Sequence, residues 1–313
     1  MGVTHTSTRV VSLGEGATPL IAAPRLSDEL GAHVHLKCEG LNPTGSFKDR
    51  GMAVAVSRAA EAGVRTVVCA STGNTAASAA AYAARAGLKA VVLTPQGATA
   101  GPKRAQARAA GAQVLEVRGT FDDALRCCRE LAAEDGYALV NSLNPDRIEG
   151  QKTVAFELLT DLGAAPDVVA LPFGGGGNLC AVAKGFAQAG EKPRLVAGEA
   201  AARATTWASA IRIREPAHAA EVRELADAGR AEIVSLDEDE IRMAWHDLAR
   251  LEGVFCEPAS AASLAALRRA QPAHDSVAVC ILTGHGLKDP SAVEEGSPVV
   301  VDPSLDAILE ALA

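Results

Sequence analysis

Lys48 lies in a segment that suits a reactive amine. The segment reads NPTGSFKDR, in which proline and glycine favour a tight turn and Ser46 is placed to cap a helix that begins near Phe47. Lys48 then falls in the first helical turn, where the positive end of the helix dipole disfavours an ammonium and so lowers the pKa. An amine nucleophile needs such a shift. The alternative is a solvated lysine that pairs with Asp49.

Two further segments suit anion binding at the start of a helix. Residues 70–75 read ASTGNT after an apolar run, and their hydroxyl and backbone N–H groups suit a carboxylate or a phosphate. The alternative for this segment is ordinary helix capping. The second segment reads FGGGGN, and its four glycines let the backbone approach a phosphate closely. These glycines are Gly174, Gly175, Gly176 and Gly177. A structural turn needs fewer of them, so the segment predicts ligand binding.

Two other interpretations of these segments are weaker. A dinucleotide-binding fold would use Glu199 as its ribose-binding acid, but it places its glycine loop after the first strand, and here an apparent lobe precedes the loop. A hydrolase would use Ser71 with His285 as base, but the Gly-x-Ser-x-Gly elbow is absent. Thr283 directly follows an apolar run, so its hydroxyl is expected at the sheet edge where open α/β folds bind ligands. His285 is equally compatible with a turn.

The elements that must position these residues alternate between short β-rich runs and longer helical runs. The expected strands are 66–69, 90–93, 113–117, 138–140, 168–171, 195–198 and 277–282. The expected helices are 74–86, 103–110, 121–134, 150–162, 178–189, 239–252 and 259–270. This repeated order predicts an α/β fold with two open parallel-sheet lobes and helices on both faces of each sheet.

The bulk composition excludes several classes of protein. The chain has 313 residues, 48% hydrophobic and 22% charged, which is typical of a globular chain long enough for two lobes. A formal charge of -8 without basic runs argues against a nucleic-acid partner. No apolar stretch suits a bilayer, and residues 1–9 lack a signal-peptide core, so we expect no membrane partner and a cytoplasmic location. The seven cysteines lack Cys-x-x-Cys spacing, which predicts reduced thiols and no metal site.

Six stretches together resemble the fold-type II pyridoxal-phosphate enzymes, and most closely the members that act on O-phospho-L-homoserine. They occur in the family's order over most of the chain, which is far more specific than any single glycine loop. The stretches are 39–51 (EGLNPTGSFKDRG), 71–75 (STGNT), 141–145 (NSLNP), 147–152 (RIEGQK), 255–260 (FCEPAS) and 282–289 (LTGHGLKD). The resemblance implies a cofactor in the cleft between the lobes, a smaller domain over 45–140, a larger domain formed by 1–44 and 141–313, and a homodimer.

The resemblance also implies cofactor roles for individual residues. Lys48 would form the Schiff base with pyridoxal 5'-phosphate and later move the Cα proton. Asn74 would hydrogen-bond the 3′-oxygen of the ring, and Thr283 would face the ring nitrogen. Gly174 to Gly177 and Asn178 would hold the cofactor phosphate. A hydroxyl facing the ring nitrogen should leave that nitrogen largely unprotonated.

Substrate roles follow from the same resemblance. Ser71, Thr72 and Thr75 would meet the carboxylate of the amino acid. The substrate's own phosphate would be bound by Asn141, Ser142 and Arg147, since an arginine fork suits a phosphate dianion. The implied reaction converts O-phospho-L-homoserine and water to L-threonine and phosphate by γ-elimination and β-addition.

Three alternatives stay open. A threonine or serine dehydratase shares the cofactor and most motifs, but its substrate carries no phosphate for Arg147 to bind. A β- or γ-replacement enzyme of specialised metabolism is compatible because residues 198–210 are shortened relative to familiar members. A non-catalytic ligand-binding module would leave Lys48 idle. The all-glycine loop before Asn178 also departs from the family, which often has another asparagine there.

Overall fold

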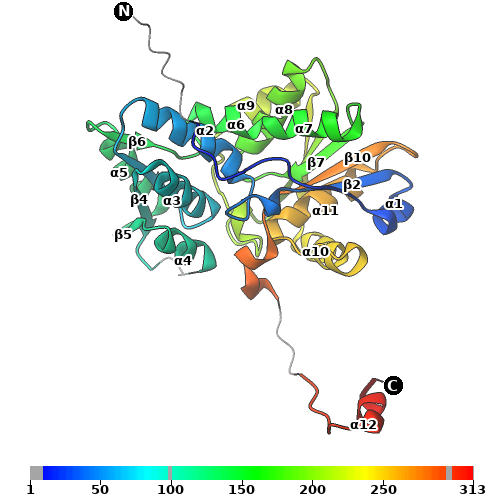
Figure 1. Cartoon of the computed structure of the whole chain (residues 1–313). Coiled ribbons are helices and arrows are strands. Elements are labelled where there is room, and N and C mark those ends of the chain that lie inside the picture. The colour runs from blue at the N-terminus through cyan, green and yellow to red at the C-terminus, as the bar shows by residue number, and fades with distance from the viewer. Residues whose placement is uncertain (1–9, 98–100, 294–297, 313) are drawn as a thin grey trace, which may run out of the picture.

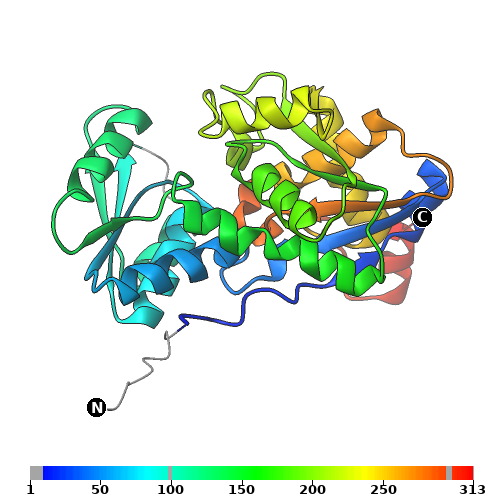
Figure 2. The ribbon, with the colours of Figure 1, turned by 90° about the horizontal axis from the view of Figure 1, so that it is seen from above.

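Two separate sheets organise the chain, as Figures 1 and 2 show. The computed structural model describes residues 10–97, 101–293 and 298–312. The strands of the larger sheet, in chain order, are β1 (Leu20–Ala22), β2 (His33–Cys38), β7 (Val168–Pro172), β8 (Arg194–Ala200), β9 (Ala231–Leu236) and β10 (Val277–Leu282). The strands of the smaller sheet are β3 (Thr66–Ala70), β4 (Lys89–Pro95), β5 (Gln113–Val117) and β6 (Tyr137–Leu139).

The strand order differs from the chain order in both sheets. The larger sheet runs β1-β2-β10-β7-β8-β9 and the smaller runs β5-β4-β3-β6. Every pairing is parallel except that of β1 with β2, which is antiparallel. In such sheets, ligands bind beyond the carboxyl ends of the strands, where the order reverses.

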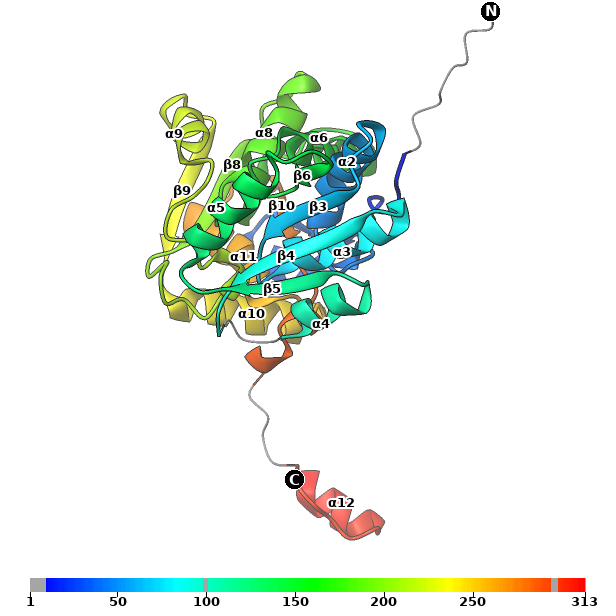
Figure 3. The same ribbon diagram turned by 90° about the vertical axis from the view of Figure 1, so that its left-hand side faces the viewer.

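Helices cover both faces of each sheet (Figures 1 and 3). The smaller lobe carries α3 (Asn74–Ala86), α4 (Pro102–Ala109) and α5 (Phe121–Leu131). Helix α2 (Lys48–Glu61) packs on the smaller lobe and α7 (Thr153–Leu162) on the larger lobe, and α6 (Pro145–Gln151) crosses α2 where the lobes meet. The larger lobe carries α1 (Pro24–Leu30), α8 (Gly177–Gln188), α9 (Ala219–Asp227), α10 (Glu238–Glu252) and α11 (Ala262–Ala270).

Shorter elements complete the described chain. The 3₁₀ turns are η1 (Glu39–Leu41), η2 (Ser209–Ile211), η3 (Pro258–Ala261), η4 (Gly286–Lys288) and η5 (Pro290–Ala292). Helix α12 (Leu305–Leu312) has no buried side chain. Among the described residues, no helix is both long and apolar enough to span a membrane.

Strand β10 shows why the larger sheet needs helices on both faces. Its side chains alternate between two cores: Ala278, Cys280 and Leu282 pack into one, and Val279 and Ile281 into the other. A strand buried on both faces reads as a continuous apolar run, which is how the sequence reveals it. The predicted fold class, two parallel-sheet α/β lobes, is therefore confirmed.

Several local predictions need correction. The single helix expected over 150–162 is two helices, α6 and α7, which meet at Lys152, and the helix expected over 259–270 begins with the 3₁₀ turn η3. Ser46 does not cap α2: the N-cap residue is Phe47, and the buried Ser46 hydroxyl has no partner. Elements β1, α1, β2, α9 and β9 were not predicted. The domain boundaries near 45 and 140 stay a prediction.

Helices α2 and α6 cross at a pair of glycines. A Cβ at Gly51 would lie 2.6 Å from the carbonyl oxygen of Arg147 and 2.8 Å from its Nε. A Cβ at Gly150 would overlap the carbonyl group of Arg50. This close crossing holds Arg147 against the helix whose first residue is Lys48.

Candidate active site

The segment that carries Lys48 is hydrogen-bonded to the loop that follows β10. The N–H of Phe47 donates to the carbonyl oxygen of Thr283 at 3.0 Å, and the N–H of His285 donates to that of Gly45 at 3.0 Å. Ser46 and Gly284 form an antiparallel bridge between these bonds. Lys48 is thereby fixed at the carboxyl end of the larger sheet.

The amine of Lys48 is poised for nucleophilic chemistry. Its Nζ lies 4.3 Å from the centroid of the Phe47 ring. Its pKa is lowered to about 7, mainly by removal from water and also by the nearby charge of Arg147, while the carboxylate of Glu257 acts in the opposite direction. The prediction of a lowered pKa therefore agrees with the structure, but the main cause is burial and not the helix dipole.

Asp49 does not neutralise its neighbour Lys48. Its carboxylate accepts from the backbone N–H of Thr44 at 2.7 Å and from the Thr44 hydroxyl at 2.6 Å. The hydroxyl of Ser78 on α3 donates to it at 2.6 Å. Asp49 thus ties the turn before α2 to α3, and the interpretation of Lys48 as a solvated lysine paired with Asp49 is wrong.

Asn74 opens α3 and reaches across to the larger lobe. Its Nδ2 donates to both carboxylate oxygens of Glu257, at 2.8 and 3.1 Å, while its buried Oδ1 has no partner. In the preceding loop, the Ser71 hydroxyl accepts from the N–H of Gly73 at 3.0 Å. Thr72 is exposed and Thr75 is half-buried. The structure therefore gathers this segment at the end of β3, as the sequence predicts.

Thr283 directly follows β10 and is buried. Its hydroxyl lies 3.1 Å from that of Ser260 in η3. The Ser260 hydroxyl also accepts from the N–H of Gly284 at 3.0 Å, so it holds both Thr283 and the residue that follows it. The hydroxyl of Thr283 is thus paired with another neutral hydroxyl.

The glycine loop joins β7 to α8. Gly176 has φ +88°, a left-handed conformation that favours glycine, and a Cβ at Gly175 would meet only the Ile213 side chain, at 3.6 Å. The first backbone N–H groups of α8 lack helical acceptors and suit an anion. At the same helix start, the buried Nδ2 of Asn178 has no partner. A donor without an acceptor points to a ligand here.

Arg147 on α6 is a buried arginine with too few acceptors. Its side chain is 1% exposed, and its Nη1 donates to the carbonyl oxygen of Val140 at 2.9 Å. Its Nε and Nη2 have no partner. Burial lowers the pKa to about 10, since desolvation disfavours the charge. An uncompensated buried guanidinium is costly, so this site calls for an anion.

Asn141 and Ser142 directly follow Val140, whose carbonyl oxygen accepts from Arg147. The Asn141 amide forms a pair of 2.9 Å hydrogen bonds with the backbone of Ala70, which leaves one N–H and one lone pair for other groups. The Nε2 of His218 donates to the carbonyl oxygen of Ser142 at 2.9 Å, and the N–H of His218 donates to that of Gly175 at 3.1 Å. His218 thereby joins Ser142 to the glycine loop.

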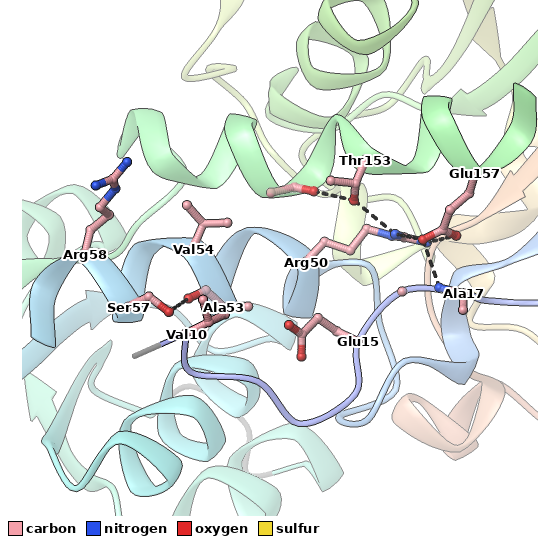
Figure 4. Close-up of a pocket in the computed structure, with 12 residues that line it drawn as sticks. Val10, Glu15, Ala17, Arg50, Ala53, Val54, Ser57, Arg58, Thr153 and Glu157 are labelled. Atoms are coloured by element: carbon pink, nitrogen blue, oxygen red, sulfur yellow. Dashed lines mark hydrogen bonds and ion pairs between the residues drawn. The ribbon is translucent and has the colours of Figure 1, made fainter. Parts of the chain in front are cut away.

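A cavity of about 550 Å³ lies elsewhere, between α2, α7 and the N-terminal segment (Figure 4). Arg50 on its wall donates to Glu39 at 2.6 and 2.7 Å, and also to Thr153 and Glu157. In contrast to Arg147, Arg50 is fully paired. We assign this cavity no chemistry, because the amine of Lys48 and the unpartnered donors of Arg147 and Asn178 do not line it.

Three residues at the site were missed from the sequence. Glu257 lies inside a stretch that matched the family, but it was given no role. Lys103 was seen only as part of a basic pair, although its Nζ lies 3.1 Å from a Glu257 oxygen. His218 carries no local signal, because its contacts are with residues distant in the chain. Only the match over residues 255–260 offered a way to find any of them.

The fold and this constellation define a class: the chain belongs to the family of pyridoxal-phosphate dependent enzymes, whose profile matches residues 11–284. It is 49% identical to the threonine synthase of Mycobacterium leprae, over 95% of this chain and 89% of that protein. It is 47% identical to the threonine synthase of Halalkalibacterium halodurans, over 95% and 89%. Among solved structures, a threonine deaminase from T.th. superposes with a TM-score of 0.72 at 29% identity, covering 90% of this chain and 94% of that one.

The residues present fit the cofactor that this family binds. A partly desolvated amine is available at Lys48, and an open glycine loop lies at the start of α8. Unpartnered atoms of Asn74 and Asn178 are buried nearby. The amine suits the aldehyde, and the glycine loop with the Nδ2 of Asn178 suits the phosphate. The Asn74 amide suits the ring oxygen through an N–H of its Nδ2, because Oδ1 and that oxygen are both acceptors.

Proposed function

We propose that this chain is a threonine synthase, which converts O-phospho-L-homoserine and water to L-threonine and phosphate. The observation that carries the proposal is Arg147: a buried guanidinium with free Nε and Nη2 groups beside the lysine of the cofactor site. A substrate with a phosphate on its side chain supplies the anion that Arg147 lacks. The relatives that share 44–49% identity with this chain are threonine synthases.

We propose that the two lobes hold the cofactor between them. Lys48 would attach it covalently as a Schiff base, and Asn74 would bond its ring oxygen. Thr283 would face its ring nitrogen. The cofactor phosphate would be held by Gly174, Gly175, Gly176, Gly177 and Asn178. When bound, pyridoxal phosphate supplies an electron-withdrawing ring that makes the substrate Cα–H bond acidic.

The substrate would be held at both ends. Ser71, Thr72 and Thr75 would bind its carboxylate at the start of α3. Arg147 and Ser142 would bind its phosphate. Asn141, which is held by the backbone of Ala70, would complete the phosphate pocket. Two anion sites separated by the reacting carbons favour a substrate with a carboxylate at one end and a phosphate at the other.

Lys48 would then move protons at the reacting carbons. Its neutral amine takes the Cα proton, for which a pKa near the working pH is suitable. A Cβ proton is also lost, the Cγ–O bond breaks, and phosphate departs with the bonding electrons. Cγ gains a proton to become the methyl group, water adds its hydroxyl to Cβ, and the amine of Lys48 returns a proton to Cα. We propose that the phosphate retained by Arg147 serves as the base at Cβ.

The test compares two substrates on the same enzyme. Purified protein loaded with pyridoxal phosphate is incubated with O-phospho-L-homoserine or with L-threonine, and threonine, phosphate and 2-oxobutyrate are quantified. We expect threonine and phosphate in equal amounts from the first and little 2-oxobutyrate from the second. Rapid dehydration of threonine with no turnover of phosphohomoserine would instead establish a dehydratase, the activity in the name of the T.th. threonine deaminase structure.

Two further features belong to this proposal. We expect a homodimer, as the family resemblance implies, and light scattering of the purified protein at twice the chain mass would support it. We also expect the enzyme to work in the cytoplasm. All seven cysteines are free thiols, which fits a reducing compartment.

A further inference from the structure

Glu257 lies at the junction of the lobes and has no part in the chemistry described above. Its side chain is 1% exposed, and its backbone N–H donates to the carbonyl oxygen of Gly284 at 2.9 Å. A Cβ at Gly284 would overlap the Glu257 carboxylate. The carboxylate is therefore held in place by the loop that also carries Thr283.

The carboxylate decides how the amide of Asn74 is oriented. A carboxylate only accepts hydrogen bonds, so the NH₂ side of the amide must face it, at 2.8 and 3.1 Å. The carbonyl side must then turn away, and the buried Oδ1 is indeed without a partner. The ring 3′-oxygen of the cofactor is an acceptor, so it must be met by the second N–H of Nδ2 and not by Oδ1. Glu257 thus decides which side of the amide can donate to a ligand.

A lysine of the smaller lobe compensates the charge of Glu257. Lys103, in the first turn of α4, places its Nζ 3.1 Å from Glu257 Oε2 and 3.9 Å from Asp289 Oδ2. Its side chain is 10% exposed, so the pair is little screened by solvent. The charge that Asn74 meets therefore depends on whether α4 rests against the larger lobe.

We infer that Glu257 is a positioning residue: it fixes the Asn74 amide for the cofactor, and Lys103 couples that amide to the contact between the lobes. The inference rests on the proposed roles of Lys48 and Asn74. In this arrangement, one carboxylate joins the cofactor-facing amide of Asn74 to the position of α4 against the larger lobe.

The charges of Glu257 and Lys103 act in opposite directions on the pKa of nearby amines. Glu257 raises the pKa of Lys48 and of Lys288, and it also raises that of Cys256, while Lys103 lowers that of Lys288. Removal of the Glu257 charge should therefore lower the pKa of a cation at Lys48. Removal of the Lys103 charge should raise it. The two ends of one ion pair thus predict opposite shifts.

The experiment uses the holoenzyme with pyridoxal phosphate and the matched variants Glu257→Gln and Lys103→Met. The visible absorption of the bound cofactor is titrated with pH, its retention is measured by dialysis, and thermal unfolding is recorded. We expect the spectral midpoint of Glu257→Gln to fall by roughly half to one pH unit, and that of Lys103→Met to rise. We also expect Glu257→Gln to retain the cofactor about tenfold less well.

A merely structural role would give a different result. Both variants break the same ion pair, so equal losses of thermal stability with midpoints that move together, or not at all, would overturn the inference. A second test is a double-mutant cycle with Asn74→Ala, scored by cofactor retention. If Glu257 acts through Asn74, Glu257→Gln adds little in the Asn74→Ala background; additive losses would contradict it.

Two controls keep the outcomes distinct. If Glu257→Gln does not fold, Glu257→Asp keeps the charge but withdraws it from Asn74, so it should weaken retention without lowering the midpoint. A lowered midpoint in Glu257→Asp would also count against the inference. Wild-type protein that binds the cofactor at Lys48 but does not turn over phosphohomoserine refutes the proposed function and leaves the role of Glu257 to be decided by these variants.

Discussion

Gly51 and Arg147 touch at the crossing of α2 and α6: a Cβ on Gly51 would lie 2.6 Å from the Arg147 carbonyl oxygen and 2.8 Å from its Nε. The first turn of α2 begins with Lys48, so the missing side chain at position 51 is what allows the arginine to lie beside Lys48. The geometry of two functional residues on separate helices therefore depends on a third residue that has no side chain.

Gly51→Ala should displace Arg147. We expect a loss of about 1–3 kcal/mol in the free energy of unfolding, typical of overpacking. We also expect a larger fall in kcat/KM for O-phospho-L-homoserine than in cofactor retention. Gly101→Ala is the matched control, since a Cβ at that position meets nothing within 4 Å. Wild-type kinetics in Gly51→Ala would show that the contact does not position Arg147.

Arg147→Met should separate function from stability. Loss of the phosphate contact should lower kcat/KM for O-phospho-L-homoserine roughly thirty- to several-hundred-fold, which corresponds to a loss of ~2–4 kcal/mol in transition-state stabilisation. Arg147→Lys should recover only part of this, since an ammonium lacks the fork. Any slow dehydration of threonine should be nearly unchanged. An equal loss on both substrates would instead mean that Arg147 supports the fold.

The cofactor-free protein provides the complementary measurement. Arg147→Met should unfold in urea at the same or a higher concentration than wild type, because it removes a buried charge with unmet donors. Arg50→Met should lose about 3–5 kcal/mol, because it strands the carboxylates of Glu39 and Glu157. Similar losses in both variants would contradict the distinction between these two buried arginines.

The attachment of pyridoxal phosphate to Lys48 should accelerate with pH and level off above neutrality. Only the neutral amine attacks the aldehyde, and burial lowers the pKa of Lys48 to about 7. The rate of attachment should therefore rise about tenfold between pH 6 and pH 8 and little beyond. Borohydride reduction followed by peptide mapping identifies the lysine, and Lys48→Ala is the blank. A rate that keeps climbing to pH 10 would indicate an ordinary lysine.

Thr283→Asp should change the cofactor without releasing it. A carboxylate in this position favours a protonated ring nitrogen, which strengthens electron withdrawal and should increase side reactions. The absorption spectrum and the product profile are the measurements. Ser260→Ala is the control, because it removes the 3.1 Å hydroxyl contact but keeps Thr283. An unchanged spectrum in Thr283→Asp would place Thr283 away from the ring.

The parts of the fold that could be predicted are those with a local signal. Strands such as β10 read as apolar runs, and α3 begins at Asn74 and ends at Ala86 as its pattern and the following glycine indicate. Strand β2 was missed because its sequence, HVHLKC, interrupts the apolar residues with polar ones. The cap at Ser46 was wrong by one position, which is within the usual uncertainty of a helix end.

The contacts of the site were less predictable than its members. The motifs identified Lys48, Asn74 and Arg147, but a motif does not state what each side chain meets. Asn74 and Glu257 are 183 residues apart in the chain. No local pattern reveals that they touch, nor that Asp49 turns away from Lys48 towards Thr44 and Ser78.

The pairing of β2 with β10 constrains the order in which the two lobes can fold during synthesis. Strand β2 lies between β1 and β10 in the larger sheet, so a strand synthesised near the start of the chain waits for one synthesised near its end. The strands of the smaller sheet, from Thr66 to Leu139, follow one another directly and can assemble while the rest is still being translated. The bond from Phe47 to Thr283 forms only after β10 has left the ribosome. The site is thus closed by the last strand of the sheet, and a chain that stops short of it carries the reactive lysine without the surroundings that control it.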